Sequence, residues 1–245
     1  MPSTRLPLAG LLIVTACAPA AVAESLSDDL HGTFAPVLAD TVQDGRVDYA
    51  KVASSHAAAL DRYLGDLAAV DLEGAGDADK LAYYINLYNA TMLKAVVDGG
   101  GRGAFKPSDK DFDVFKRPLV RTKAGAMSLN DLENKVVRPT FEDARVHAAL
   151  VCAAVSCPPL IDRPYTAAML DAQLDANVKS WLADPSRNRI DDTTKTLRLS
   201  KIFDWYADDF GGKANVAKWV AEKTGRDVGG YKVEFVEYDW TLNSK

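Results

Sequence analysis

The chain has 245 residues, 48% of them hydrophobic and 26% charged, which is the composition of a globular protein. This composition excludes a disordered polymer, a collagen and a protein with many membrane-spanning helices. The formal net charge of −5 excludes the strongly basic field that attracts nucleic acid, so we expect no nucleic-acid partner. The length is enough to bury a sizeable core in one large domain or two small ones.

Residues 1–23 have the features of an export signal. Arg5 is their only charged residue, the apolar run over residues 6–16 is too short for a permanent membrane span, and Ala-Val-Ala at 21–23 offers a cleavage site. Alternatively, residues 14–17 resemble a lipobox, in which the signal ends at residue 16 and Cys17 is lipidated. We favour the first interpretation because the Ala-Val-Ala site ends the apolar stretch cleanly. We therefore expect a periplasmic protein, or a lipoprotein that touches the membrane only through Cys17.

Export would change the charge and the cysteine count. Removing residues 1–23 takes away one Arg and no acidic residue, so the net charge becomes −6. It also removes Cys17 and leaves Cys152 and Cys157, close together in the chain. Export places this pair in a compartment where disulfides persist.

The mature chain, residues 24–245, reads as one helix-rich domain. Apolar periodicity and caps predict helices from Ser27 to about residue 38 and over about 50–69, 79–98, 166–182, 200–210 and 213–224, with a short helix from Ser128 that stops at Pro139. Hairpins are expected over 119–127 and 190–199, and strands over 145–152 and 231–235. The pattern has no internal repeat. It predicts a single α+β domain with a small, mainly antiparallel sheet.

The helix over 79–98 is apolar nearly all round, so it should be buried. Asn86 and Asn89 lie three residues apart on one side of it, and a buried Asn must find hydrogen-bond partners. One interpretation is that both side chains tie the helix to neighbouring backbone. The other is that one of them polarises a substrate carbonyl or orients a histidine.

His147, Cys152 and Cys157 form the densest group of reactive side chains. A histidine can hold a thiolate at neutral pH, so the group suggests a cysteine nucleophile. On an unbroken strand, His147 and Cys152 would point to opposite faces, whereas Cys157 on the following loop is free to turn back. Alternatively, the cysteines form a structural disulfide, Cys152 is an inert buried cysteine, or His147 is a core histidine. Their spacing matches no familiar zinc pattern, and we expect no metal and no cofactor.

The remaining histidines, His31 and His56, fall within amphipathic N-terminal helices, where we expect surface or cap positions. The chain has no phosphate loop, no dinucleotide fingerprint and no Gly-x-Ser-x-Gly elbow. These absences in the sequence leave the thiol group as the main candidate for chemistry.

Five separated segments share their residues and order with one family. They are residues 84–90, 128–134, 147–160, 199–203 and 238–243. Together they resemble the domain of unknown function 547, over about residues 31–243. The resemblance implies a bacterial envelope protein and little biochemistry. The motifs also contain the polar residues Asn89 and Glu133, whereas Asn134 stands where many members of the family have His, so a role of that His does not carry over.

The chain also has a weak similarity to the papain and transglutaminase group of thiol enzymes. It rests on a buried helix, a strand that begins near a histidine, and Asp239 beside Trp240, which could orient and shield an imidazole. In that group the nucleophile opens the core helix, whereas the buried helix here carries Asn86 and no cysteine.

Two hypotheses follow from the sequence. The first is a thiol-dependent hydrolase or acyl transferase acting on amide bonds of envelope peptides or proteins. Its nucleophile would be Cys157, with Cys152 as the second candidate, His147 the base, Asp239 its orienter and Asn86 the oxyanion donor. The second is a non-enzymatic periplasmic binding or scaffold protein with a structural Cys152–Cys157 disulfide.

Overall fold

A computed structural model describes residues 26, 28–100 and 113–245. The expected export signal and Cys17 lie outside the described residues. Within the described part of the chain, no helix combines the length and apolarity needed to cross a membrane.

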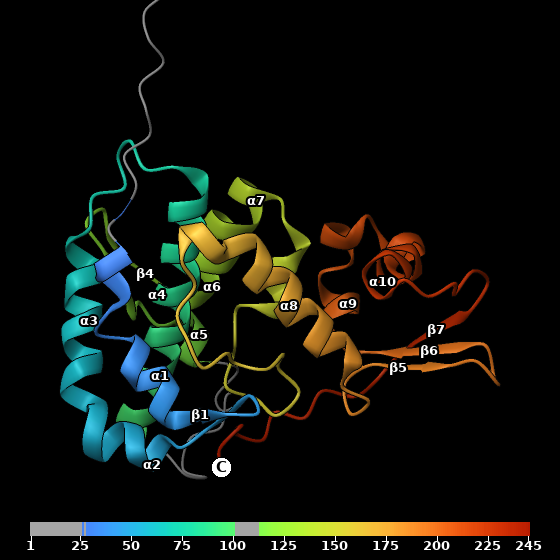
Figure 1. Cartoon of the computed structure of the whole chain (residues 1–245), viewed down its shortest axis with the longest axis horizontal. Helices are drawn as coiled ribbons and strands as arrows, with labels where there is room; N and C mark the ends of the chain where they lie inside the picture. Colours follow the sequence, from blue (N-terminus) through green and yellow to red (C-terminus); the bar gives the residue numbers. More distant parts are fainter. Residues whose placement is uncertain (1–25, 27, 101–112) are drawn as a thin grey trace, which may run out of the picture.

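Helices account for most of the described elements, which confirms the helix-rich α+β class (Figure 1). The α-helices are α1 (Ala35–Thr41), α2 (Tyr49–Lys51), α3 (Ala57–Ala69), α4 (Asp77–Asp98), α5 (Asp113–Lys116), α6 (Leu129–Asp131), α7 (Arg138–Phe141), α8 (Leu170–Ala183), α9 (Ile202–Trp205) and α10 (Val216–Thr224). The 3-10 helices are η1 (Asp28–His31), η4 (Ala144–Ala148), η5 (Ala167–Met169), η6 (Ala207–Phe210) and η7 (Lys213–Asn215). Two π-helical stretches, η2 (Val52–His56) and η3 (Leu132–Val137), continue α2 and α6.

The strands form small sheets. Two are two-stranded and antiparallel: β1 (Val42–Gln43) with β2 (Arg46–Val47), and β3 (Val120–Thr122) with β4 (Gly125–Met127). The third has the order β5 (Arg189–Asp191), β6 (Thr196–Leu199), β7 (Lys232–Phe235). Strands β5 and β6 are antiparallel and β6 and β7 are parallel. The predicted hairpins and late strand are confirmed, and the pairing is mainly antiparallel as expected.

Two apolar clusters form the core. The first packs around α4, which is buried on nearly every side as its sequence predicts. The second joins the end of α8 to α9, α10 and the three-stranded sheet, and contains the stacked rings of Trp181 and Phe203, 4.8 Å apart. In Figure 1 the first cluster lies on the left and the sheet on the right, with α8 running between them. The site described below lies where the two clusters meet.

The predicted strand over residues 145–152 is wrong. Its first half is the 3-10 helix η4, and residues 149–152 have no strand partner. The physical reason is that the Asn89 side chain takes the place of a neighbouring strand: its Nδ2 donates to the Ala149 carbonyl at 2.9 Å, and its Oδ1 accepts from the Val151 N–H at 2.9 Å. The apolar run is therefore buried without being paired.

Two smaller predictions are also corrected. The helical segment from Ser128 does not stop at Pro139 but runs through it to Phe141. The hydrogen bonding has widened to the π pattern just before the proline, since the Arg138 N–H donates to the Glu133 carbonyl five residues earlier, and this relieves the clash that a proline ring makes within a regular α-helix. His31 is buried rather than on the surface, with its Nδ1 2.7 Å from the Tyr63 hydroxyl. The Ser128 cap is confirmed, since its hydroxyl accepts from the Asp131 N–H at 3.0 Å.

The C-terminal segment, residues 238–245, ties distant parts of the chain together. The Val155 N–H donates to the Thr241 carbonyl at 2.7 Å, and the Asn243 N–H donates to the Ala153 carbonyl at 2.8 Å. Asn243 also accepts a 2.6 Å hydrogen bond from the Tyr49 hydroxyl. Two of the family-like segments, 147–160 and 238–243, are thus adjacent in space.

The turn between β1 and β2 touches the loop that follows Cys157, and this contact predicts a stability effect. Gly45 has φ +74°, and a Cβ there would lie 2.6 Å from the Pro159 Cβ. Gly74 has a similar φ of +78° with nothing within 4 Å of a Cβ. Both Ala variants carry a backbone cost of about 1–2 kcal/mol, and we expect Gly45→Ala to lose about 1–3 kcal/mol more by overpacking.

Urea unfolding of the two variants measures this difference, and Gly74→Ala is the matched control. Equal losses of unfolding free energy in the two variants would contradict the close contact with Pro159.

Candidate active site

A cavity of about 470 Å³ lies where the two core clusters meet. Its walls come from α4, α5, the 128–138 helical segment, η4, the 152–157 loop, α9 and the C-terminal segment. Six aromatic side chains line it: Tyr88, Phe115, Trp205, Tyr206, Tyr238 and Trp240. We call it the aromatic cavity. Among its polar lining residues are His147 and Glu133, together with the sulfur-bearing Cys152 and Cys157.

His147 is the buried base of the cavity. Its side chain is only 2% exposed, and its ring lies 4.2 Å from the Tyr206 ring. Its Nε2 lies 2.6 Å from Oδ2 of Asp209. Asp209 in turn accepts hydrogen bonds from Arg138, through Nε at 2.6 Å and Nη2 at 2.8 Å. Burial would raise the pKa of Asp209, but the hydrogen bonds from His147 and Arg138 outweigh it and lower the pKa well below the ordinary value.

The partner of Nε2 determines the tautomer of the imidazole. Ionised Asp209 can only accept, so Nε2 of His147 carries the hydrogen. In the neutral ring, Nδ1 then holds the lone pair. In this tautomer Nδ1 is the ring nitrogen that can accept a proton.

Cys152 and Cys157 form a disulfide in the wall of the same cavity. Cys157 is buried, whereas Cys152 is partly exposed. Two donors point at the Cys157 sulfur: the Cys152 N–H at 3.0 Å and the Tyr238 hydroxyl at 3.2 Å. The 152–157 loop is held from below by Arg187, which donates to the carbonyls of Val155 and Cys157.

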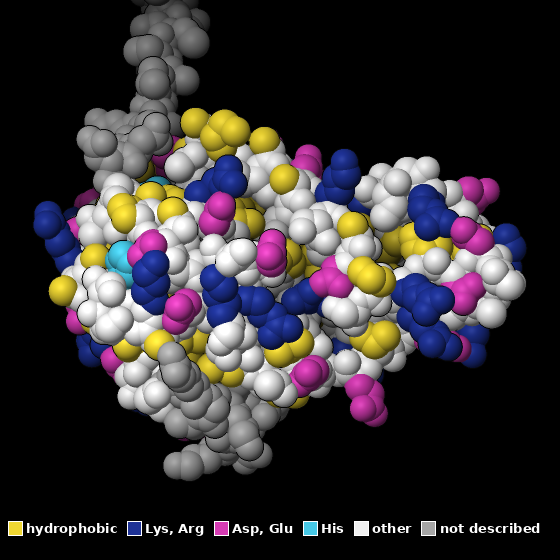
Figure 2. All heavy atoms as spheres, turned by 60° about the horizontal axis from the view of Figure 1, so that its bottom comes forward, with side chains coloured by type: hydrophobic (Ala, Val, Ile, Leu, Met, Phe, Trp, Pro, Cys, Tyr) yellow, Lys and Arg dark blue, Asp and Glu magenta, His cyan; other side chains and the backbone are white. Residues whose placement is uncertain are grey.

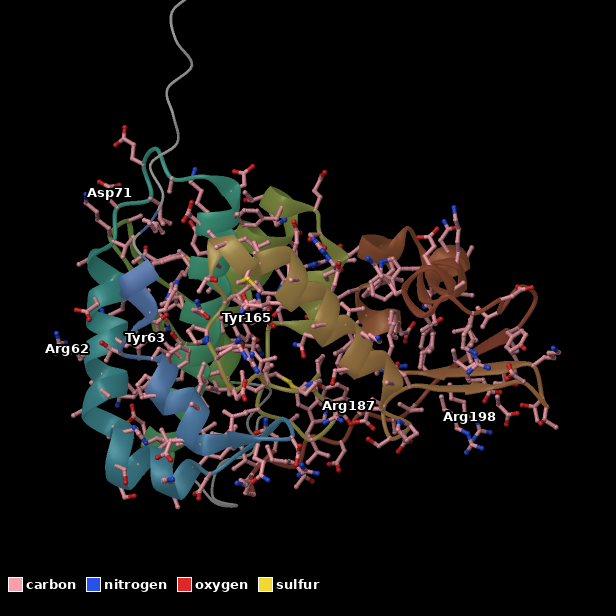
Figure 3. All side chains as sticks on the ribbon, viewed as in Figure 1. Arg62, Tyr63, Asp71, Tyr165, Arg187 and Arg198 are labelled. Atoms are coloured by element: carbon pink, nitrogen blue, oxygen red, sulfur yellow. A yellow bond between two sulfur atoms is a disulfide. The ribbon has the colours of Figure 1, made fainter. Side chains whose placement is uncertain are left out.

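Figure 3 places Arg187 beneath α8 and Tyr165 in the interior, whereas Arg198 projects away from the sheet. Arg187 therefore has a structural role, because its guanidinium holds the backbone of the 152–157 loop in place. Burial lowers its pKa, and its guanidinium faces backbone carbonyls and Asp184.

Glu133 is the carboxylate of the cavity wall. It lies in the π-helical stretch η3, where the Arg138 N–H donates to the Glu133 carbonyl five residues earlier. Burial raises the pKa of Tyr88 and Tyr206, and the charge of Glu133 with its hydrogen bonds to these hydroxyls acts in the same direction. The tyrosines therefore stay neutral and serve as donors to Glu133.

The structure brings together four of the residues that the sequence singled out and leaves three elsewhere. His147, Cys152, Cys157 and Glu133 line the aromatic cavity. Asn86 clamps the backbone of Tyr165, donating to its carbonyl at 2.7 Å and accepting from its N–H at 2.9 Å. Asn89 clamps Ala149 and Val151 in the same way, as described above. These contacts tie α4 to neighbouring backbone. Nδ2 of Asn86 also lies 3.3 Å from Nε2 of His31, a histidine that does not line the aromatic cavity.

Asp239 is exposed and does not orient His147. Its carboxylate accepts from the Thr241 N–H at 2.9 Å and closes a local turn. Asp209 takes the expected role instead. Sequence reasoning missed it because it follows Asp208 in an acidic pair just before a glycine turn, which reads as a solvated helix end. His147 and Asp209 are 62 positions apart in the sequence, and nothing in the intervening segment indicates that they are in contact.

Within the described residues, no group of three or more His, Cys, Asp or Glu side chains is arranged to hold a metal ion. Asn134 hydrogen-bonds to Arg138, through an Oδ1–Nη1 contact of 2.6 Å. It therefore supports the guanidinium that holds Asp209.

Comparisons with known proteins give a family and no closer relative. No curated protein and no solved structure matches the chain. A family profile described as "Protein of unknown function, DUF547" matches residues 72–182. This range contains α4, Glu133, His147 and both cysteines of the cavity, and three of the five segments that carried the resemblance. The segment over residues 72–182, which carries most of the cavity's polar groups, therefore matches the family of proteins of unknown function DUF547.

Proposed function

We propose that this protein is an exported thiol-dependent hydrolase or acyl transferase that acts on amide bonds, such as those of envelope peptides. The observation that carries the proposal is a single cavity lined by His147, already paired with Asp209, and by both cysteine sulfurs. A cysteine nucleophile requires a thiol and a base that can take its proton, and both residue types line this one cavity.

The chemistry requires the disulfide to open. A thiol reductant supplies two electrons and two protons, and converts the bridge into two thiols. Nδ1 of His147 then takes the thiol proton while the sulfur bonds to the amide carbon. The imidazolium returns that proton to the departing amine as the C–N bond breaks, which leaves a thioester. Water completes hydrolysis, or a second amine completes acyl transfer.

Of the two sulfurs, Cys157 is the first candidate for the nucleophile. The Cys152 N–H and the Tyr238 hydroxyl would both stabilise a thiolate there, since hydrogen bonds to the charged form favour it. Cys152 is the second candidate because it is the more exposed of the two. Its sulfur also lies 3.0 Å from the Tyr238 hydroxyl.

Thiol titration tests the proposal without a known substrate. After reduction, we expect one cysteine to be alkylated by iodoacetamide with an apparent pKa below the ordinary value of about 8.5. A His147→Gln variant should move this apparent pKa back toward the ordinary value. His56→Gln is the matched control, because His56 pairs with Asp40 outside the cavity.

Cys152→Ser and Cys157→Ser variants assign the titrating sulfur, and cleavage of peptide 4-nitroanilides by the reduced protein measures turnover. The proposal would be contradicted if both thiols were alkylated with the ordinary apparent pKa and if His147→Gln left that pKa unchanged.

The alternative is a non-enzymatic binding or scaffold protein in which the bridge is structural. The specific observation in its favour is that both sulfurs are joined and Cys157 is buried. In that case, reduction should lower the free energy of unfolding and expose no reactive thiol.

A further inference from the structure

The aromatic cavity combines a carboxylate with a wall of aromatic rings. Tyr238 lies at the centre of that wall, with its ring 4.9 Å from Trp205 and 4.5 Å from Trp240. Trp205 is 46% exposed, which is unusual for so large an apolar side chain and places it at the mouth of the cavity. Aromatic faces at this spacing attract cations through the negative face of each ring.

The charge of Glu133 is not balanced by an ion pair with any Lys, Arg or His of the described residues. Its hydrogen-bonding neighbours are the hydroxyls of Tyr88 and Tyr206, which are neutral. Arg138 interacts electrostatically with Glu133, but the hydrogen bonds of its guanidinium go to Asp209 and Asn134.

The cavity wall therefore holds one negative charge that lacks a cationic partner of its own. Partly desolvated carboxylates are costly unless paired, so the site is electrostatically complementary to a cation. Lys116, which is exposed, lines the cavity as well and could meet an anionic group of the same ligand. On the face drawn in Figure 2, acidic and basic side chains are interleaved.

We propose that the aromatic cavity binds an alkylammonium group, held between the tyrosine and tryptophan rings and the carboxylate of Glu133. The group would belong to the substrate, which makes the substrate an amide that carries a positively charged amine. This assignment of a substrate class rests on the proposed function. The binding itself does not, because it needs no free thiol, and Glu133 and Trp205, the two residues changed in its test, take no part in the thiol chemistry.

Binding is measured on the protein with its disulfide intact, by isothermal titration calorimetry and by tryptophan fluorescence. The probes are choline and butylammonium, each compared with a neutral analogue of similar shape, 3,3-dimethylbutan-1-ol and butan-1-ol. We expect at least one cation to bind about 5–30-fold more tightly than its neutral analogue, the range that cation–π contacts and a desolvated carboxylate provide.

Glu133→Gln should remove most of this preference and leave the affinity for the alcohols unchanged. Glu237→Gln is the matched control, since Glu237 is exposed, adjoins Tyr238 in sequence and does not line the cavity. It should behave as the wild type. Trp205→Leu, at an exposed position where folding is tolerant of change, should also weaken cation binding.

Equal affinity for cation and alcohol, no binding of either, or an unchanged preference in Glu133→Gln would each overturn the inference. Because the disulfide stays intact in this experiment, a negative result would not contradict the proposed thiol chemistry, which the thiol titration tests separately. Conversely, an ordinary thiol titration with selective cation binding would retain the ammonium site on a non-enzymatic protein.

Discussion

An Asp209→Asn variant is expected to lose about 10²–10⁴ in the rate at which the reduced protein cleaves an amide substrate. Arg138 donates to both carboxylate oxygens of Asp209, and His147 donates to one of them. An amide has a single oxygen. If that oxygen takes the Oδ1 position, opposite Nη2 of Arg138, the amide NH₂ faces Nε2 of His147 and forces the hydrogen onto Nδ1, so the base is lost. If it takes the Oδ2 position, it still accepts from Nε2 of His147, but the negative charge that stabilises the imidazolium is gone.

The measurement is turnover of whichever peptide 4-nitroanilide the reduced wild type cleaves, together with the pH dependence of thiol alkylation. Asp208→Asn is the control, because Asp208 is the exposed neighbour and its removal takes away the same charge. Turnover in Asp209→Asn within a few-fold of the wild type would show that the His147–Asp209 pair is structural only.

The pH of the comparison matters, because Asp209 also contributes to acid stability. Its folded-state pKa lies below the ordinary value of 3.8. A carboxyl group of this kind stabilises the fold above its unfolded-state pKa and loses that contribution as the pH falls through the folded-state value. The two proteins should therefore be compared near pH 7, where the contribution is fully present, and the wild type should lose its advantage in stability only under strongly acidic conditions.

Asn86→Ala is expected to lower the free energy of unfolding by about 2–5 kcal/mol, because it leaves the buried N–H and carbonyl of Tyr165 without partners. Each unsatisfied buried backbone group costs about 1–3 kcal/mol. Asn215→Ala is the matched control. Its side chain also bonds one backbone carbonyl, that of Gly211, but at an exposed position where water replaces the bond.

Denaturant unfolding followed by circular dichroism measures both variants, and Asn215→Ala should lose less than about 1 kcal/mol. The result separates the two roles considered for Asn86. A stable Asn86→Ala protein with a large loss of turnover would instead mark this residue as an oxyanion donor and contradict the clamp.

The sequence predicted the local elements well where the signal was itself local. The all-round apolarity of residues 79–98 gave a buried helix, and α4 spans Asp77–Asp98. The hairpins and the Ser128 cap followed from turn and cap residues. The strand predicted over 145–152 is wrong because an apolar run also suits a buried loop when a side chain, here that of Asn89, satisfies its backbone.

For the candidate site too, the sequence predicted the features that are local in the chain, and the tertiary structure decided the rest. From the sequence alone came the helix-rich α+β class, the family, and the grouping of His147 with Cys152 and Cys157, because these features reside in short stretches of chain. The tertiary structure alone decided that Asp209, not Asp239, holds the imidazole, that the two sulfurs are joined, and that Glu133 faces an aromatic wall. The first and third outcomes depend on contacts between residues that are far apart in the sequence, such as His147 and Asp209, which are 62 positions apart. The packing of the two core clusters brings such residues together.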